Sequence, residues 1–552
     1  MSRVLIIGNG ISGLSSAISL AERGVESVLV SPFPSERSQS VMAAGGINSV
    51  ELSDAVPDTV GQHVADTLRG GHDIAGESAV RGLCEAAPGI IEQLEKYGTV
   101  FTRREDGMID RRPFGGQTYD RTCYCGTSTG KQIVTALVHE ARRYEAAGLI
   151  RRRSWTDFHS ALICDGQCFG ALLYNEAIRQ LELVPAQALV MATGGQNTLF
   201  GKTTGTTTCD GYAAGRLLMQ GAELKNLEFI QYHPTTIETP QKRMLISEAA
   251  RGEGGRLYYE ENGERVYFME DLYGERGNLM PRDVVSRCIW ETGRQVYLDV
   301  TFLGKEKIDA RIPEVRDLCA KYIGLDISRE PIPVAPSVHF FMGGIAVDIH
   351  HETNIRDLFA VGECASIYHG ANRLGGNSLL AAIYSGQQAA AEIAGRIAQR
   401  GESAEEDTVR AMFAAFAEKE SAALKNRVSD KSQFPVAYIR DMLAENMKDQ
   451  LGISRDAKTL RRGIDDVSFY LGIADKIRFD NSVLEYFNYS LTGILTLAKA
   501  VLTSAYERKE SRGAHYRSDY PQEDDRYKAA SIISMTDGEM KVRYDTEGRY
   551  ES

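Results

Sequence analysis

The sequence predicts an α/β protein in which a Rossmann-like dinucleotide-binding domain carries an inserted α+β domain and is followed by a helical domain. Near the amino terminus, an apolar run enters a helical pattern through the spacing Gly8-x-Gly10-x-x-Gly13. Buried-strand patterns return at residues 340–348 and 358–362, after a long stretch of different composition. A helical pattern then continues to about residue 508. One sheet that is interrupted by an insertion and followed by helices explains these observations.

The first 30 residues have the pattern of a strand, a glycine turn, a helix and a second strand. Gly8 allows the tight turn, Gly10 lets a pyrophosphate approach the backbone, and Gly13 lets the helix contact the sheet. The acid that usually ends the second strand of nicotinamide-binding proteins is missing, because Ser31 stands at that position. This segment therefore predicts dinucleotide binding and argues against a standard nicotinamide site.

A second polar turn separates the strand at residues 358–362 from an alanine-rich helix that we expect at residues 378–400. The first N–H groups of a helix lack partners within the helix, so a strand, a glycine turn and a helix start form a cradle for an anion. The hydrogen-bonding side chains in this turn are Glu363, His369, Asn372, Arg373, Asn377 and Ser378. This concentration of polar groups favours a ligand site over a plain strand-to-helix connection.

Changes in composition indicate the domain limits. We expect the dinucleotide-binding domain at residues 1–226 and 340–401, the inserted domain at 227–339, the helical domain at 402–510 and a polar tail at 511–552. Within the first domain, residues 157–175 predict a hairpin that turns at Asp165-Gly166. The late helices are expected at residues 409–424, 436–451, 458–471 and 484–506.

Composition and charge exclude several classes of protein. The net charge of −12 argues against a nucleic-acid-binding surface. The nine cysteines show no CxxC and no metal-ligand spacing, so we expect reduced thiols, no metal, and no haem or iron–sulfur cluster carried by this chain. No signal-peptide pattern precedes the first strand, and the most apolar late segment, residues 491–506, is too short to cross a bilayer. We therefore expect a cytoplasmic protein with no membrane span.

Four motifs concentrate histidine, arginine and glutamate. They are residues 229–235 (FIQYHPT), 245–255 (LISEAARGEGG), 281–283 (PRD) and 337–344 (SVHFFMGG). Further motifs are residues 111–117 (RRPFGGQ), 121–123 (RTC) and 511–515 (SRGAH). With these motifs in this order, the chain resembles, nearly end to end, the flavoprotein subunit of succinate dehydrogenase and fumarate reductase. The resemblance implies that FAD occupies the dinucleotide-binding domain and that the inserted domain caps a C4 dicarboxylate at the flavin N5.

The resemblance also implies catalytic roles. Reduction of a fumarate-like alkene needs a hydride at one carbon and a proton at the other. Arg282 matches the family's proton donor, and Glu248 and Arg251 match the relay that returns the proton. A guanidinium normally stays protonated, so an arginine in this role needs a partner that reprotonates it at once. The i, i+3 spacing of Glu248 and Arg251 would place them on one face of a helix.

Substrate and cofactor positions follow from the same match. A dicarboxylate needs charge-assisted donors at both ends, and the matched positions are His233, Ser247, His339 and Arg373, with His369, Phe114 and Gln117 as further pocket residues. The implied FAD contacts are Gly8, Gly10, Gly13, Ser31, Asp210, Glu363, Ser378 and Leu379. The small-residue stretch at residues 35–48, which contains Ser38, Gln39, Gly45 and Gly46, suits close approach of the backbone to a ring.

Gln39 is the main departure from the family pattern. The family usually has at this position a histidine that is bonded covalently to the flavin, and glutamine cannot form that bond. The resemblance therefore implies noncovalent FAD with a lowered potential, where each ~30 mV of a two-electron couple corresponds to about 1.4 kcal/mol. A lower potential makes succinate a poorer electron donor. We expect a reductase of fumarate, or of a close relative, that has lost succinate oxidation.

Other functions stay open at this point. L-aspartate oxidase has the same fold and noncovalent FAD, and a reductase of another unsaturated (di)carboxylate would carry similar motifs. An inert electron-carrying or assembly subunit is disfavoured by the retained Arg282, Glu248 and Arg373. The resemblance further implies an iron–sulfur partner subunit that is joined to a membrane quinone module or a soluble donor. Electron transport of this kind, as in anaerobic respiration, would place the chain at the inner face of the cell membrane through its partners.

Overall fold

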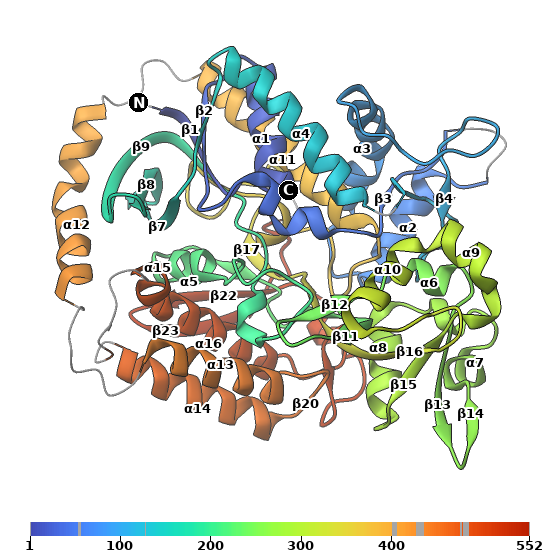
Figure 1. The fold of residues 1–552 in the computed structure, drawn as a ribbon. Helices are drawn as coiled ribbons and strands as arrows, with labels where there is room; N and C mark the ends of the chain where they lie inside the picture. Colours follow the sequence, from blue (N-terminus) through green and yellow to red (C-terminus); the bar gives the residue numbers. More distant parts are fainter. Residues whose placement is uncertain are drawn as a thin grey trace.

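The computed structural model describes residues 2–52, 57–126, 128–399, 406–426, 435–474, 477 and 485–550. Figure 1 shows three regions: the dinucleotide-binding part, mostly in blue and cyan, at the top, the inserted part in yellow-green at the lower right, and most of the late helices in orange and red below. The expected α/β class with an inserted α+β part and late helices is confirmed. The expected limit at residues 401–402 lies outside the described residues.

A seven-stranded sheet organises the first region. Its strand order is β6-β2-β1-β9-β8-β7, with β18 paired to β9. The strands are β1 (Ser2–Ile7), β2 (Ser27–Val30), β6 (Ile150–Arg153), β7 (Thr156–Cys164), β8 (Gln167–Asn175), β9 (Gln180–Met191) and β18 (Leu358–Ala360). β1 is central and parallel to both β2 and β9. Its successive residues Val4–Ile7 are all buried, so both faces of the strand are covered, which explains its continuously apolar sequence. The expected hairpin is formed by β7 and β8, with Asp165 and Gly166 at positive φ in its turn.

Helices cover this sheet and place the glycine turns at its carboxyl edge. The helices are α1 (Ile11–Glu22), α2 (Val60–Gly70), α3 (Glu77–Lys96), α4 (Thr129–Ala146), α5 (Tyr212–Met219) and α11 (Asn377–Gln399). α1 packs against both α4 and α11. α11 is the helix that was expected at residues 378–400. A small sheet of order β3-β5-β4 closes the side near α2, formed by β3 (Ile47–Asn48), β4 (Arg111–Arg112) and β5 (Thr122–Cys123).

The inserted part is built on a six-stranded sheet of order β12-β11-β16-β15-β13-β14. The strands are β11 (Ile230–Glu238), β12 (Arg243–Leu245), β13 (Arg256–Glu261), β14 (Glu264–Val266), β15 (Val296–Asp299) and β16 (Ile332–Phe341). Its helices are α6 (Ala249–Gly252), α7 (Phe268–Tyr273), α8 (Arg282–Glu291), α9 (Gly304–Arg311) and α10 (Pro313–Ile323). Residues such as Ile246, Leu257 and Leu298 form a separate apolar core here, so this part packs as its own unit.

The late helices differ in arrangement from the expectation. They are α12 (Glu406–Asn426), α13 (Val436–Gln450), α14 (Ala457–Ala474), α15 (Glu485–Tyr489) and α16 (Leu491–Glu507). The helix expected at residues 484–506 is divided at Ser490, and residue 484 lies outside the described part. α13, α14 and α16 pack together, whereas α12 lies on β9 (Figure 1). Val409 and Phe413 of α12 are buried with Leu162 and Leu172, so this apolar stripe attaches α12 to the first region.

The sequence suggests a polar tail at residues 511–552, but in the structure this segment contains a β-hairpin. β22 (Ser531–Thr536) and β23 (Glu539–Tyr544) form a hairpin, and β22 pairs with β10 (Leu224–Lys225). With β17 (Gly344–Ala346) and β19 (Ala365–Ser366), they form a five-stranded sheet of order β19-β17-β10-β22-β23. Asp537 and Gly538 both have positive φ, which is typical of a two-residue hairpin turn. Within the described ranges, no helix has the length and apolar character needed to cross a membrane.

Candidate active site

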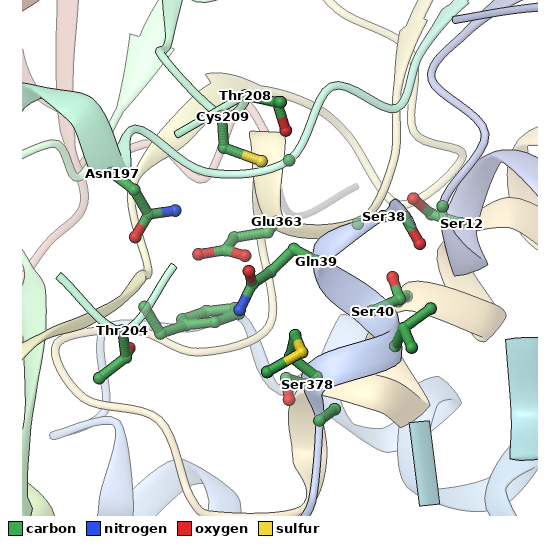
Figure 2. Close-up of a pocket in the computed structure, with 18 of the residues that line it drawn as sticks. Ser12, Ser38, Gln39, Ser40, Asn197, Thr204, Thr208, Cys209, Glu363 and Ser378 are labelled. Carbon is green, nitrogen blue, oxygen red and sulfur yellow. The ribbon is translucent and has the colours of Figure 1, made fainter. Parts of the chain in front are cut away.

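One cavity of about 480 Å³ runs from the first glycine turn to the sheet of the inserted part. Figure 2 shows the end of this cavity where Gln39, Glu363 and Ser378 point inward from three separate segments. Most of the expected cofactor residues line it: Gly8, Gly10, Ser31, Ser38, Gln39, Gly45, Gly46, Asp210, Glu363, Ser378 and Leu379. The expected cofactor contact of Gly13 is not found. Gly13 lies behind the cavity wall, where it packs against the backbone of Gly8.

The glycine turn after β1 leaves no room for a side chain at Gly8 or at Gly13. A Cβ on Gly8, whose φ is +109°, would lie 2.1 Å from the carbonyl oxygen of Ala192, and one on Gly13 would lie 1.9 Å from that of Gly8. The backbone therefore packs tightly below the turn, while the N terminus of α1 opens into the cavity. This is the close approach that a pyrophosphate group needs.

Two carboxyl groups line the cofactor end of the cavity, the partly buried Glu363 and the buried Asp210. Oε1 of Glu363 accepts a hydrogen bond from the Phe341 N–H at 3.2 Å, and burial raises the pKa of this carboxyl to about 7. Asp210 accepts hydrogen bonds from the Tyr212 N–H at 3.0 Å and from the Tyr486 hydroxyl at 3.1 Å. Burial likewise raises the pKa of Asp210. Both groups offer acceptor capacity to ligand hydroxyls.

Unpartnered polar atoms at the same end fit a bound dinucleotide. Among the described residues, the Gln39 Oε1 and the Ser38 hydroxyl are buried and have no hydrogen-bond partner. Buried polar groups are almost always hydrogen-bonded, so these atoms indicate a polar ligand against this wall. With the glycine turn and Glu363, they provide phosphate contacts and hydroxyl acceptors, which is the donor and acceptor set that FAD requires.

A buried guanidinium group lies at the other end of the cavity. Arg282, the first residue of α8, donates from Nη2 to Oε2 of Glu248 at 2.7 Å and from Nε to the same oxygen at 2.9 Å. Glu248 also accepts from the Gly115 N–H at 2.7 Å, and its Oε1 lies 3.5 Å from Arg251. Although burial raises it, the charges of Arg282 and Arg251 hold the pKa of Glu248 down to about 2. Glu248 is therefore a carboxylate that holds two cations.

Gln231 connects the two arginines that face the cavity. Its Oε1 accepts from Nη1 of Arg282 at 2.9 Å and from Nη2 of Arg373 at 2.9 Å. Its Nε2 donates to the carbonyl oxygen of Arg373 at 2.7 Å and to Oδ1 of Asn372 at 2.9 Å. The guanidinium of Arg373 also lies 4.2 Å from the ring centre of Phe340. Gln231 thus sets the spacing of two positive groups at one end of the cavity.

Three histidines complete this end in neutral form. The rings of His233 and His339 lie 5.2 Å apart between centres, and Nδ1 of His339 is 2.7 Å from the Thr204 hydroxyl. Burial, and then the charge of Arg282, lowers the pKa of His233, and burial lowers that of His369 to about 3. Burial and the neighbouring His233 lower the pKa of His339. At neutral pH these rings contribute N–H donors without adding charge.

Register shifts between β11 and β16 orient two of these histidines. Gln231 pairs with Phe340 and Tyr232 pairs with Val338, so His339 is the extra residue of a bulge in β16. A second register shift lies between His233 and Thr236 in β11, where Pro234 lacks an N–H for the ladder. Bulges commonly redirect side chains next to active sites. Here they bring His233 and His339 to the same cavity.

Comparison with known proteins agrees with this geometry. A family pattern described as "FAD binding domain" matches residues 3–379, and one described as "Fumarate reductase flavoprotein C-term" matches residues 440–548. The chain is 36% identical to the succinate dehydrogenase flavoprotein subunit of Bacillus subtilis, with 95% of this chain and 92% of that relative covered. It is also 36% identical to one subunit of the CoM/CoB fumarate reductase of Methanothermobacter marburgensis, over 96% of each chain.

A solved structure extends the likeness to the whole fold. The FrdA chain of Escherichia coli quinol fumarate reductase matches with a TM-score of 0.89 at 31% identity, covering 98% of this chain and 96% of that one. The chain belongs to the succinate dehydrogenase/fumarate reductase flavoprotein family. It is an oxidoreductase subunit that binds FAD, as its motifs predicted.

Within this family chain, the remaining expected site residues fall into two groups. Phe114, Ser247, His369 and Arg373 line the cavity together with His233, Glu248, Arg282 and His339. Gln117 does not line it: its Nε2 donates to Asn48 at 3.1 Å and to the carbonyl oxygen of Gly375 at 3.0 Å. Arg251 lies behind Glu248 and donates to the carbonyl oxygen of Asn278 at 2.5 Å. Gln117 therefore supports the turn before α11, in which Gly375 lies. Arg251 can act on the cavity only through Glu248.

Sequence reasoning missed Gln231 and the supporting residues of the turn. Gln231 stands two positions before His233 on the same strand, so the two side chains share one face, which was a usable signal. Asn377, which was expected to contact an anion, is instead buried among His63, Asn48 and Thr67. Both its amide oxygen and its amide nitrogen form hydrogen bonds within the protein, so it is a structural residue of this family site.

Proposed function

We propose that this chain reduces fumarate to succinate with noncovalently bound FAD. The observation that carries the proposal is the position of Arg282, which Glu248 and Gln231 hold next to Arg373 at one end of the cavity. A dicarboxylate is the ligand class that such an end suits, because two guanidiniums and neutral imidazole donors face it. The cofactor residues lie at the other end of the same cavity.

The proposed cofactor site uses the glycine turn for the pyrophosphate and Asp210 and Glu363 as acceptors for hydroxyl groups. These residues would hold FAD, which when bound and reduced would supply a hydride equivalent to one carbon of the substrate double bond. The helix dipole at the start of α11, where Ser378 lies, favours negative charge on a ligand placed there. Gln39 faces this end and cannot bond covalently to a flavin, so we infer that the cofactor is released by denaturation.

The proposed substrate residues hold both carboxylates. Arg373 offers a bidentate cation to one, and His233, His339 and Ser247 offer neutral donors to the other end. Binding of a dianion would also satisfy the Nε of Arg373, which is buried without a partner among the described residues. Charge-assisted contacts of this kind can polarise the double bond and so contribute to catalysis.

Arg282 is the proposed acid. Its guanidinium gives a proton to the second carbon of the double bond, while the first carbon receives the hydride, so that the alkene becomes succinate. The neutral guanidine that remains is then the strongest base in the site. Glu248 is ionised, so it must first accept a proton from Arg251, which lies 3.5 Å away, and then pass it to the guanidine of Arg282 at 2.7 Å. General acid catalysis of this kind contributes about 10²- to 10⁴-fold.

We infer that electrons come from an iron–sulfur partner subunit. The chain shows no cysteine spacing for a cluster of its own, and two of its relatives are named as subunits. That partner would receive electrons from a membrane quinone module or from a soluble donor. Through such a partner, the chain would lie at the inner face of the cell membrane.

The deciding experiment follows oxidation of the reduced flavin. The protein is reduced anaerobically, fumarate is added, and recovery of the flavin absorbance is timed in the wild type, in Arg282→Gln and in Arg287→Gln. Arg287 lies on the same helix and is partly exposed, so it serves as a matched control. We expect the Arg282→Gln rate to fall by about 10³-fold and the Arg287→Gln rate to stay within about twofold of the wild type.

The direction of the reaction and the identity of the substrate are tested with the same wild-type protein. We expect succinate oxidation to be much slower than fumarate reduction, because Gln39 leaves the flavin potential low. Equal rates would contradict the proposed direction. Peroxide formed only with aspartate would instead identify an L-aspartate oxidase, and fast reaction with a different unsaturated acid would change the substrate. No response to any of these acids would overturn the enzymatic proposal.

A further inference from the structure

His72 lies outside the cavity and joins three parts of the chain. It follows α2, and about 30% of its side chain is exposed. Its Nδ1 lies 2.7 Å from Oε1 of Glu523 in the carboxyl-terminal tail. Its Nε2 lies 3.8 Å from Oδ2 of Asp283, the second residue of α8. The imidazole of the first region therefore stands between one carboxylate of the inserted part and one of the tail.

The backbone around His72 packs against the turn at residues 369–376, which precedes α11 and is called the substrate turn below. His72 and Asp73 have φ of 53° and 54°, which is uncommon for residues other than glycine. The carbonyl oxygen of Gly71 accepts from the Ala371 N–H at 2.9 Å, and a Cβ on Gly71 would lie 2.8 Å from the carbonyl oxygen of His369. A strained conformation that persists in a tightly packed place is typical of functional positions.

A continuous chain of hydrogen bonds leads from this junction to the two arginines of the cavity. Oδ1 of Asp283 accepts from Nδ2 of Asn372 at 2.9 Å. Oδ1 of Asn372 accepts from Nε2 of Gln231 at 2.9 Å. Oε1 of Gln231 accepts from Arg282 and Arg373 at 2.9 Å each. Asp283 is also the neighbour of Arg282 in the sequence, so it acts on α8 both through the backbone and through this chain.

We propose that protonated His72 is a positioning residue that joins α8 to the carboxyl-terminal tail and thereby holds Arg282 and Arg373 in the geometry that binds the dicarboxylate. This inference rests on the proposed function. His72 touches neither cofactor nor substrate, so its effect falls on substrate affinity rather than on the chemical step. Among the side chains that the structure describes, loss of the His72 charge leaves Asn372 as the partner of Asp283, and the substrate end loosens.

The charges around His72 make this junction dependent on pH. Asp283 and Glu523 face the ring, while Arg512 pairs with Glu523 at 3.0 Å and Lys528 with Asp73 at 3.6 Å. Although burial lowers it, the two facing carboxylates raise the pKa of His72 above its ordinary value of 6.5. A raised histidine pKa means that the ion pair is complete at low pH and is lost as pH rises through the raised value.

Fumarate binding to the oxidised FAD-containing protein tests the proposal, with flavin absorbance as the signal. In the wild type we expect the Kd for fumarate to rise as pH increases from about 6 to about 9. His72→Gln should show the weak, high-pH affinity throughout, about fivefold above the wild type at low pH. His72→Arg, which keeps the charge, should bind tightly at all these pH values. Glu523→Gln, at a half-exposed position, removes one carboxylate of the junction, so it should shift the midpoint to lower pH and raise the low-pH Kd by less than His72→Gln does.

A matched control and a substrate-free readout complete the test. His350 is an exposed histidine that lies 3.6 Å from Glu392, and His350→Gln should behave as the wild type. Hydrogen exchange of the Ala371 N–H, measured without substrate at about pH 6, should be faster in His72→Gln than in the wild type. If the wild type fails to bind fumarate, the proposed function fails while exchange still reports on His72. Equal exchange rates, or an unchanged Kd in His72→Gln, would overturn the positioning role.

Discussion

At the cofactor end, the fold disfavours ionisation of Glu363. Its carboxyl group lines the cavity and accepts a hydrogen bond from the Phe341 N–H. Because burial raises its pKa from 4.5 to about 7, the folded chain holds this proton more tightly than the unfolded chain does. Ligand hydroxyls that donate to the carboxylate would reverse this preference.

The raised pKa of Glu363 predicts a specific pH dependence of the stability of the apoprotein. As pH rises from about 4.5 through about 7, the free energy of unfolding should fall by about 3 kcal/mol through Glu363, and remain lower above that range. Glu363→Gln should therefore be more stable than the wild type at about pH 8 and equal to it below about pH 4.5, while binding FAD more weakly. Chemical denaturation of both apoproteins measures the difference, and parallel pH profiles would contradict the assignment.

At the scale of elements, the turn between β1 and α1 decides whether a cofactor can be held. Its conformation depends on the absence of a side chain at Gly8, where φ is +109° and the Ala192 carbonyl is close. The two long strands β11 and β16 have the complementary role at the substrate end, because their bulges bring His233 and His339 together. The turn thus shapes the cofactor end of the cavity, and the two bulged strands shape its substrate end.

Gly8→Ala tests the glycine turn. The added Cβ would lie 2.1 Å from the Ala192 carbonyl oxygen, so the turn must move away from the sheet. We expect the purified variant to contain less than about a tenth of the wild-type FAD, as read from the ratio of flavin to protein absorbance. Gly61→Ala, in α2 with only the Thr59 side chain nearby at 3.8 Å, should keep its full FAD content. A fully flavinylated Gly8→Ala protein would refute this account of the turn.

At the scale of the whole molecule, a buried ionic network joins segments that are far apart in the sequence. Glu228 accepts from Nε of Arg508 at 2.6 Å and from the Ser531 hydroxyl at 2.8 Å. Its carbonyl oxygen accepts from Arg455 at 2.7 Å. The network links the start of the inserted part to Arg508, which directly follows α16, and to Ser531, the first residue of β22. It therefore fastens the tail to the face on which Ala371 and the substrate turn lie.

Glu228→Gln should weaken the whole assembly. Removal of one charge leaves Arg508 buried, with Glu510 as its remaining carboxylate partner among the described residues, and breaking a buried ion pair costs about 3 to 5 kcal/mol of unfolding free energy. The exposed pair of Arg81 and Glu77 supplies the control, because Glu77→Gln should change stability by less than about 0.5 kcal/mol. Denaturation midpoints of the two variants give the comparison, and similar midpoints would argue against a structural role for Glu228.

The outcome of the sequence predictions follows the range of the interactions involved. The glycine turn and α11 were predictable because their signals lie within a few residues. The β22–β23 hairpin was missed although Asp537-Gly538 marks its turn, because its partner β10 lies about 300 positions earlier. α12 was assigned to the late helices because its sequence shows a helix but not the sheet on which it packs.

By itself, the sequence determined the family, the cofactor and the residue types available for chemistry, because ordered motifs and glycine spacing are local properties of a chain. Only the tertiary structure decided which groups meet. Arg282 and Glu248 are 34 residues apart, Gln231 and Arg373 are 142 apart, and His72 and Glu523 are 451 apart. Such contacts depend on the packing of whole elements against one another. For that reason, no linear pattern could reveal that Gln231 joins two arginines or that His72 meets the tail.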